Sequence, residues 1–293
     1  MLTASTLGPL WDSLKSNAKE MGLLRRIPLY SLASGIGILA GLAREIVVAS
    51  TFGLSGDLDV LVAVMGFHLL FGVQVGNAIE QVFVSKIAPL HGRCITPLVK
   101  QVSLVLLLIN AVALTILVLG SRPVLQFIFP HFTLDQCDTG VRLIRLLLFP
   151  IACAGLAGIM RGGLSVMGRF TPGFLAGTVV SLSTIVSVLV FADRWGIDAL
   201  VWGFATGHFI VLVWFMSALG RGRFPSSKTD IQGREGVQLG ELWRPVLVVL
   251  LGELLFQAIA MTERSFASGL GTGKISAFFY AGSMVAAPLA LFT

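Results

Sequence analysis

Eight long apolar stretches, separated by short polar gaps, run through the chain. They lie approximately at residues 28–50, 58–84, 98–120, 141–160, 172–192, 199–219, 245–261 and 275–292. Most of them have the ~20 residues that a helix needs to cross ~30 Å of hydrocarbon, whereas a strand would need only about half that length. The pattern therefore predicts an all-α, polytopic membrane protein with eight transmembrane helices.

Lysine and arginine gather in every second gap between these stretches. The leading segment and the second, fourth and sixth gaps hold most of the 21 basic residues, namely Lys15, Lys19, Arg25, Arg26, Lys86, Arg93, Lys100, Arg161, Arg169, Arg221, Arg223, Lys228, Arg234 and Arg244. The alternate gaps hold only Arg122, Arg194 and Lys274. Cytoplasmic loops of membrane proteins carry the excess of basic residues, so we expect a cytoplasmic N terminus.

Composition supports the same class. The chain is 55% hydrophobic and 12% charged, against about 25% charged residues in a soluble domain. The net charge of +6 follows from the loop bias and does not indicate a nucleic-acid partner. Cys94, Cys137 and Cys153 show no CxxC or Cys/His ligand spacing, so we expect no disulfide, metal or cofactor.

The first 27 residues precede the first apolar stretch. Leu7, Leu10, Trp11 and Leu14 fall at helical spacing with Lys15 beside them, which is typical of a helix in the plane of the lipid headgroups. The apolar stretch that follows is too long for a signal peptide. We therefore expect residues 1–27 to form a cytoplasmic amphipathic segment.

Ionisable side chains inside apolar helices are the functional candidates, because each costs at least ~2.5 kcal/mol at membrane depth unless it lines a cavity or has a partner. The set is Arg44, Glu45, Glu80, Arg142, Arg145, Glu253, Glu263 and Arg264. Arg142 and Arg145 share a helix face, and either line a cavity or extend to the interface. Arg44 either pairs with Glu45 or faces a cavity; adjacent residues do not face each other on a helix, which favours the cavity.

Other polar positions have structural explanations. His68 and His208 lack a second ligand three or four residues away, so packed histidines are expected rather than a metal site. Asp57 and Asp59 resemble the paired acids of metal-dependent sugar-nucleotide transferases, but at the start of a helix they are better explained as caps. The glycines at 155, 158, 162 and 163 allow helices to approach closely or to bend.

Several motifs resemble the MurJ family of lipid II flippases, in the multidrug/oligosaccharidyl-lipid/polysaccharide exporter superfamily. These motifs are Gly41-Leu42-Ala43-Arg44-Glu45 with Phe52-Gly53 and Asp59, then Gln81-Val82-Phe83-Val84, then Phe149-Pro150 with Gly168-Arg169-Phe170-Thr171-Pro172, and finally Glu263-Arg264-Ser265-Phe266-Ala267-Ser268 with Lys274-Ile275-Ser276-Ala277-Phe278-Phe279-Tyr280-Ala281. The resemblance implies two six-helix lobes around a cavity that opens alternately to each side.

On this basis residues 28–219 form a six-helix N-terminal lobe and residues 220–244 a basic cytoplasmic connector. Residues 245–293 supply only the first two helices of a second lobe, so the chain is expected to be truncated. The resemblance also implies cavity arginines at or near Ile38, Gly72 and Ser283, where this chain has none. Arg44 is the basic position that it keeps.

The interpretation that these observations favour is a multi-pass flippase of the bacterial inner membrane, and not an enzyme. It would move a polyprenyl-diphosphate-linked saccharide, such as lipid II, from the inner to the outer leaflet, and membrane lipids are its other expected partners. The expected substrate-binding residues are Arg44, Asp59, Arg142 and Arg145; Glu253, Glu263 and Arg264 are the coupling candidates.

Three alternatives remain open. The first is an exporter of another amphiphilic substrate. The second is a non-transporting remnant, or a half protein that needs a second chain. The third is a membrane enzyme acting on lipid-linked sugars, for which His131, Asp135 and Asp138 form the only cluster near an outer loop.

Overall fold

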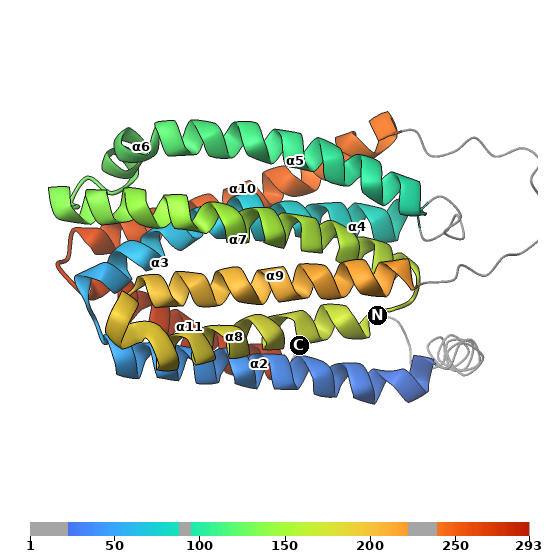
Figure 1. The fold of residues 1–293 in the computed structure, drawn as a ribbon, viewed down its shortest axis with the longest axis horizontal. Coiled ribbons are helices and arrows are strands. Elements are labelled where there is room, and N and C mark those ends of the chain that lie inside the picture. The colour runs from blue at the N-terminus through green and yellow to red at the C-terminus, as the bar shows by residue number, and fades with distance from the viewer. Residues whose placement is uncertain (1–22, 88–94, 222–238, 293) are drawn as a thin grey trace, which may run out of the picture.

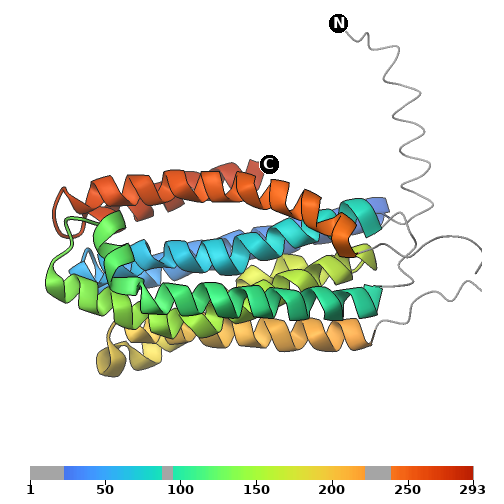
Figure 2. The ribbon, with the colours of Figure 1, turned by 90° about the horizontal axis from the view of Figure 1, so that it is seen from above.

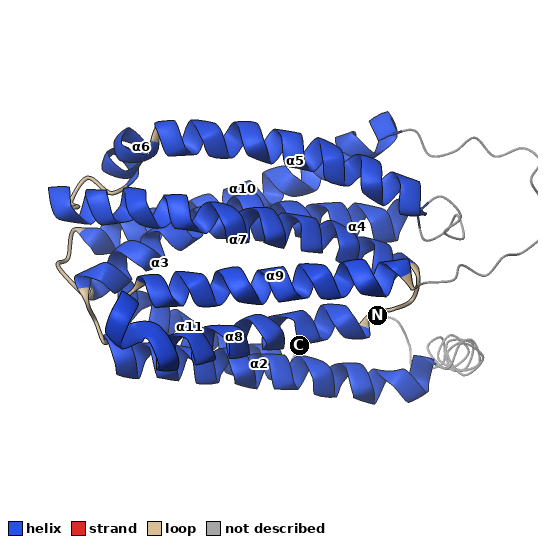
Figure 3. Ribbon diagram, viewed as in Figure 1, coloured by secondary structure: helices blue, strands red, loops and turns tan. Residues whose placement is uncertain are grey.

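A computed structural model describes residues 23–87, 95–221 and 239–292, and in these residues every regular element is a helix (Figure 3). The elements are α2 (Leu23–Phe52), α3 (Gly56–His68), the π-helix η1 (Leu69–Gln74), α4 (Val75–Ile87), α5 (Ile95–Leu119), α6 (Ser121–Ile128), α7 (Leu134–Val166), α8 (Thr171–Trp195), α9 (Asp198–Gly220), α10 (Leu239–Ser268) and α11 (Lys274–Phe292). The prediction of an all-α membrane protein is confirmed.

The membrane-spanning helices follow the apolar stretches closely. Within the described residues, seven spans are long and apolar enough to cross a bilayer, and they coincide with the first seven predicted stretches. The eighth predicted stretch is the helix α11, which is not among those seven. Residues 1–22 and 222–238, which hold most of the expected amphipathic segment and connector, lie outside the described residues. α2 begins at Leu23 and α10 at Leu239. The last residues of the predicted amphipathic segment and of the predicted connector are therefore helical.

The helix ends that flank the basic gaps all lie at one end of the molecule, on the right in Figure 1. The junctions between α2 and α3, α6 and α7, α8 and α9, and α10 and α11 lie at the opposite end. The basic gaps, which alternate with the others along the sequence, therefore all adjoin the same end of the folded bundle. We call these the basic end and the outer end.

The second span is not the single helix that the sequence predicted. The stretch 58–84 is divided into α3, the π-helix η1 and α4. π-Helical turns inside α-helices occur frequently at functional sites. Here Gly72 brings η1 against α7, since a Cβ at that position would lie 3.1 Å from the Ile151 carbonyl oxygen.

Helix α7 is the centre of the first six spans. It packs against α3, η1, α4, α5 and α9, while α2 packs against α8 and α8 against α9. Leu143, Leu147 and Ile151 of α7 are fully buried in this core. Thr133 and Gln136 form a capping box at the N terminus of α7, which explains why the helix begins seven residues before the predicted stretch at Val141.

The outward faces of the bundle are apolar. Leu104, Leu108, Val112, Ile116 and Leu119 of α5 are all exposed, and their spacing of three to four residues places them on one helix face. A hydrophobic stripe of this kind in a membrane protein contacts lipid. Helices α10 and α11 lie along one side of the other spans (Figure 2), where α10 packs against α3, η1 and α4 and α11 against α2 and α3.

Candidate functional site

A cavity of about 410 Å³ lies between α2, α3, η1, α4, α7, α8 and α9, and α10 and α11 each contribute to its wall. Most of the lining is apolar, including Phe204, Phe215 and Phe279. The ionisable residues of the lining are Arg44, Glu45, His68, Arg161, His208 and Arg264. Charged groups at membrane depth are retained where they serve a polar path or ligand, so this cavity is the candidate site.

Arg44 lines the cavity and is also paired with Glu45. The Arg44 Nε donates to Glu45 Oε1 at 3.1 Å, and a second contact joins the same oxygen to Nη2. The guanidinium carbon lies 5.3 Å from the centre of the Phe204 ring on α9, a cation–π distance. Both sequence alternatives for Arg44 therefore hold at once.

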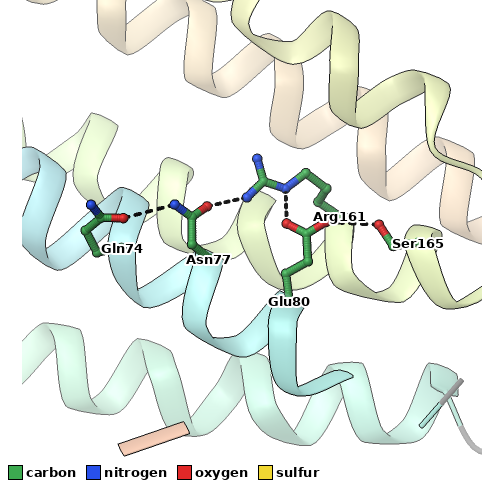
Figure 4. Close-up of polar contacts among 5 residues, drawn as sticks. All are labelled: Gln74, Asn77, Glu80, Arg161 and Ser165. Atoms are coloured by element: carbon green, nitrogen blue, oxygen red, sulfur yellow. Dashed lines mark hydrogen bonds and ion pairs between the residues drawn. The ribbon is translucent and has the colours of Figure 1, made fainter. Parts of the chain in front are cut away.

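Arg161 is the cavity residue that the sequence analysis missed. The charge alternation placed it in a cytoplasmic gap, but it lies inside α7, which continues to Val166. Its Nε contacts Glu80 Oε2 and its Nη2 donates to Asn77 Oδ1 at 2.5 Å, both on α4 (Figure 4). Ser165 donates to the other Glu80 oxygen at 3.0 Å. The signal that the sequence offered was its position, because Arg161 directly follows an apolar run and precedes two glycines.

Glycines allow α4 and α7 to approach closely enough for this network. A Cβ at Gly158 would lie 2.4 Å from the Gly76 Cα, and one at Gly162 would lie 3.1 Å from the Glu80 Cα. The small residues expected at a helix interface therefore form the crossing of these two helices. The crossing places the Arg161 guanidinium opposite Asn77 and Glu80.

Polar groups of α10 and α11 approach the first six spans without finding partners. Arg264 Nη1, Gln257 Nε2 and Tyr280 Oη are buried and make no hydrogen bond within the described residues. A Cβ at Gly66 would lie 3.2 Å from both the Arg264 Nη1 and the Gln257 Nε2 atoms. Buried polar groups without partners cost stability. Of these three residues Arg264 lines the cavity, where a polar ligand could supply the missing hydrogen bond.

His68 and His208 meet across the cavity, although they are far apart in sequence. Their ring centres are 4.8 Å apart and nearly perpendicular. His208 Nδ1 lies 2.8 Å from the Phe204 carbonyl oxygen, whereas His68 Nδ1 is buried without a partner. The described residues contain no group of three His, Cys, Asp or Glu that could hold a metal ion.

Asp59 is buried at the outer end and does not cap its own helix. Ser55 caps α3 by accepting from the Leu58 N–H at 3.3 Å. Asp59 instead accepts from the N–H groups of Gly273 at 2.5 Å and Ser276 at 2.7 Å, and from the Ser276 hydroxyl at 2.6 Å. It therefore caps α11 and is not among the cavity residues.

The remaining predicted site residues lie outside the cavity. Arg142 pairs with Asp198 at the outer end of α7 and α9, and it shares a surface hollow with Arg145 and Arg122. Glu253 is partly exposed and Glu263 is exposed.

The cluster considered for an enzyme does not converge on one point. Asp138 pairs with Arg122 at 2.9 Å, Asp135 lies in the first turn of α7, and His131 is exposed beside Gly269.

The comparisons with known proteins agree with this arrangement. The family model described as "Lipid II flippase MurJ" matches residues 48–293. The chain belongs to the MurJ family. The match begins just after Arg44. The likeness of Arg44 to a cavity arginine of the family therefore rests on the motif Gly41-Leu42-Ala43-Arg44-Glu45 alone. The family is one of flippases, which are transporters and not enzymes.

Two solved structures share the fold. A lipid II flippase MurJ in an inward closed conformation aligns with a TM-score of 0.71 and 17% identity, over 90% of this chain and 56% of that one. An inward-facing multidrug resistance MATE family transporter of the MOP superfamily aligns with a TM-score of 0.55 and 17% identity, over 90% of this chain and 59% of that one. The chain thus spans little more than half the length of each.

Proposed function

We propose that this protein moves a polyprenyl-diphosphate-linked saccharide, of the lipid II type, across a bacterial inner membrane by alternating access. The observation that carries the proposal is the convergence of three arginines, Arg44, Arg161 and Arg264, on one cavity within membrane-spanning helices. Membership of the MurJ family supports it.

The chemistry of the substrate explains why such a cavity is needed. A sugar diphosphate has charges and hydroxyl groups that would be left without partners in hydrocarbon, and this desolvation is the barrier to its crossing. A cavity with arginines replaces the water around the phosphates, since guanidinium groups can bind phosphate through two parallel hydrogen bonds. The polyprenyl tail can stay in the bilayer.

The cavity arginines of this chain lie at other positions than the family pattern implies. The resemblance implies a basic residue at or near Gly72, but a side chain there would meet the Ile151 carbonyl oxygen and the Ala154 Cβ atom. In this chain Arg161 and Arg264 supply positive charge from other helices. The cavity thus keeps guanidinium groups without the arginines expected at positions 38, 72 and 283.

Alternating access requires a contact that closes one end and can open. The bonds from Asp59 to the N terminus of α11 connect α3 with α11 at the outer end. We assign to them the closure of the cavity toward the outer side. Their separation, with movement of α10 and α11 relative to α3, would open that side.

The test is transport of a defined lipid in proteoliposomes that contain the purified protein. A fluorescent polyprenyl-diphosphate saccharide in the inner leaflet should become accessible to a membrane-impermeant quencher, while the same saccharide on an uncharged polyprenol should not. Transport of an amphiphilic cation without transport of the diphosphate would overturn the proposal and favour an exporter of another substrate.

A further inference from the structure

The Arg161 guanidinium is held by α4 but is not saturated. Its Nε and Nη2 atoms contact Glu80 and Asn77, while Nη1 points away from both residues (Figure 4). The aliphatic part of the side chain runs beside α8, because a Cβ at Gly173 would lie 3.1 Å from the Arg161 Cδ. Arg161 and Asn77 both line the cavity that contains Arg44. The free side of the guanidinium is therefore available to a ligand.

The charges of the cavity nearly cancel in the absence of a ligand. Arg44 is paired with Glu45 and Arg161 with Glu80. Of the three cavity arginines, Arg264 is the one without an ion pair in the described residues. Each phosphate of a diphosphate diester is ionised at neutral pH. Two phosphates in a largely apolar site would leave excess negative charge, which is costly in a medium of low dielectric constant. Neutralising one carboxylate removes this excess.

We propose that Arg161 is a second diphosphate-binding residue and that Glu80 is the counter-ion that it exchanges for the substrate. When the diphosphate binds, one of its oxygens takes the place of Glu80 on Arg161, and Glu80 takes a proton that the buffer acid of the solvent supplies through water. One O–H bond forms on Glu80 while the bond to that proton in the buffer acid breaks, and one ionic contact is exchanged for another. This inference rests on the proposed function and specifies how the same site binds its substrate.

Ser165 allows Glu80 to change its charge in place. A hydroxyl can donate to a carboxylate and accept from a carboxylic acid, so the contact between Ser165 and Glu80 survives in either state. Asn77 is held in turn by Gln74, whose Oε1 accepts from Asn77 Nδ2 at 2.9 Å. The network thus has fixed partners on both sides of Arg161.

Other charged groups on the surrounding helices are exposed or lie elsewhere. Lys86 of α4, Lys100 of α5 and Arg244 of α10 are exposed, and Glu253 of α10 lies outside the cavity lining. Asp193 and Arg194 lie at the outer end of α8. His68, His208 and the pair of Arg44 with Glu45 face the same cavity from α3, α9 and α2. In the described residues, Arg161 is the only ion-pair partner of Glu80.

The experiment is calorimetric titration of the purified protein in detergent with a farnesyl-diphosphate-linked monosaccharide, a diphosphate diester, in two buffers of different ionisation enthalpy. The difference between the two buffers gives the number of protons taken up with each ligand. We expect uptake in the wild type. Glu80→Gln should bind several-fold more tightly without proton uptake, because its amide does not compete for Arg161 as a carboxylate does.

Arg161→Gln should weaken binding by about tenfold to a hundredfold, the loss expected for a hydrogen bond to a charged group. Arg161→Lys, which keeps the charge but loses the planar fork, should be intermediate and serves as the second variant if Arg161→Gln does not fold. Arg122→Gln breaks an exposed ion pair with Asp138 outside the cavity and is the matched control, with unchanged affinity.

The outcomes separate this inference from the proposed function. If the wild type binds the farnesyl-diphosphate-linked monosaccharide while Arg161→Gln binds equally well and Glu80→Gln keeps the proton uptake, the pair only fastens α4 to α7 and the inference is wrong. If neither the wild type nor any variant binds the diphosphate, the proposed function fails and the inference fails with it.

Discussion

Asp59 of α3 accepts two hydrogen bonds from Ser276 of α11, one from its N–H at 2.7 Å and one from its hydroxyl at 2.6 Å. Both residues are buried, although more than 200 residues separate them in the chain. The carboxylate lies at the N terminus of a helix, where the backbone dipoles and free N–H groups favour negative charge. The contact therefore stabilises one specific docking of α11 on the first six spans.

Replacing Asp59 with Asn should loosen this docking. The amide keeps the shape of the side chain but removes the charge, so the three hydrogen bonds lose their charge-assisted character. We expect the free energy of unfolding to fall by about 1.5–3 kcal/mol, measured by thermal unfolding in detergent. Asp57→Asn is the matched control, because Asp57 is exposed on the same helix turn. An equal effect of both substitutions would contradict a specific role for Asp59.

Arg44→Ala should abolish transport in proteoliposomes without reducing the amount of folded protein in the membrane. The reason is the loss of a cavity guanidinium that reaches both Glu45 and the Phe204 ring. Arg44→Lys should restore activity only in part, since an ammonium cannot form the bidentate contact with phosphate. Size-exclusion profiles provide the folding control. Full transport by Arg44→Ala at equal abundance would remove this residue from the site.

Gly158→Ala should disrupt the crossing of α4 and α7. The added Cβ would lie 2.4 Å from the Gly76 Cα, and backbone cannot move aside as a flexible side chain can. Overpacking of this kind costs about 1–3 kcal/mol or more, which should be seen as a lower unfolding temperature and loss of the bond between Arg161 and Asn77. Gly41→Ala, where nothing lies within 4 Å of the added atom, should be close to neutral. Similar effects at both positions would argue against close helix contact.

The sequence predicted the spans well because hydrocarbon imposes a length and an apolar composition on each of them. It missed the π-helix η1, since a local change of hydrogen bonding leaves the apolar pattern of 58–84 unchanged. It also missed the early start of α7, which depends on the capping box formed by Thr133 and Gln136. Such features depend on a few hydrogen bonds and on packing, neither of which changes hydropathy.

The site was predicted only in part, because charge alone does not tell which face of a helix a residue occupies. Arg44 and Arg264 line the cavity, whereas Arg142 and Arg145 belong to a surface hollow at the outer end. Arg161 was assigned to a basic gap, since its role depends on how α7 crosses α4. Contacts between distant helices decide these assignments, and no spacing within the sequence encodes them.

The orientation of the bundle in the membrane follows from the basic end and can be tested by cysteine labelling. The basic residues predict that this end faces the cytoplasm. A membrane-impermeant maleimide added to intact cells should therefore label Leu270→Cys, in the exposed turn between α10 and α11, and should miss Ser85→Cys at the exposed end of α4. Both substitutions are at exposed positions, so neither should disturb the core.

Permeabilised cells provide the control for this labelling, because both cysteines should then react. The prediction rests on the charge of the loops and is independent of the substrate. The orientation also determines from which side of the membrane a diphosphate would approach Arg161, since α4 ends at the basic end. Labelling of Ser85→Cys but not Leu270→Cys in intact cells would reverse the topology, and the closure by Asp59 would then face the cytoplasm.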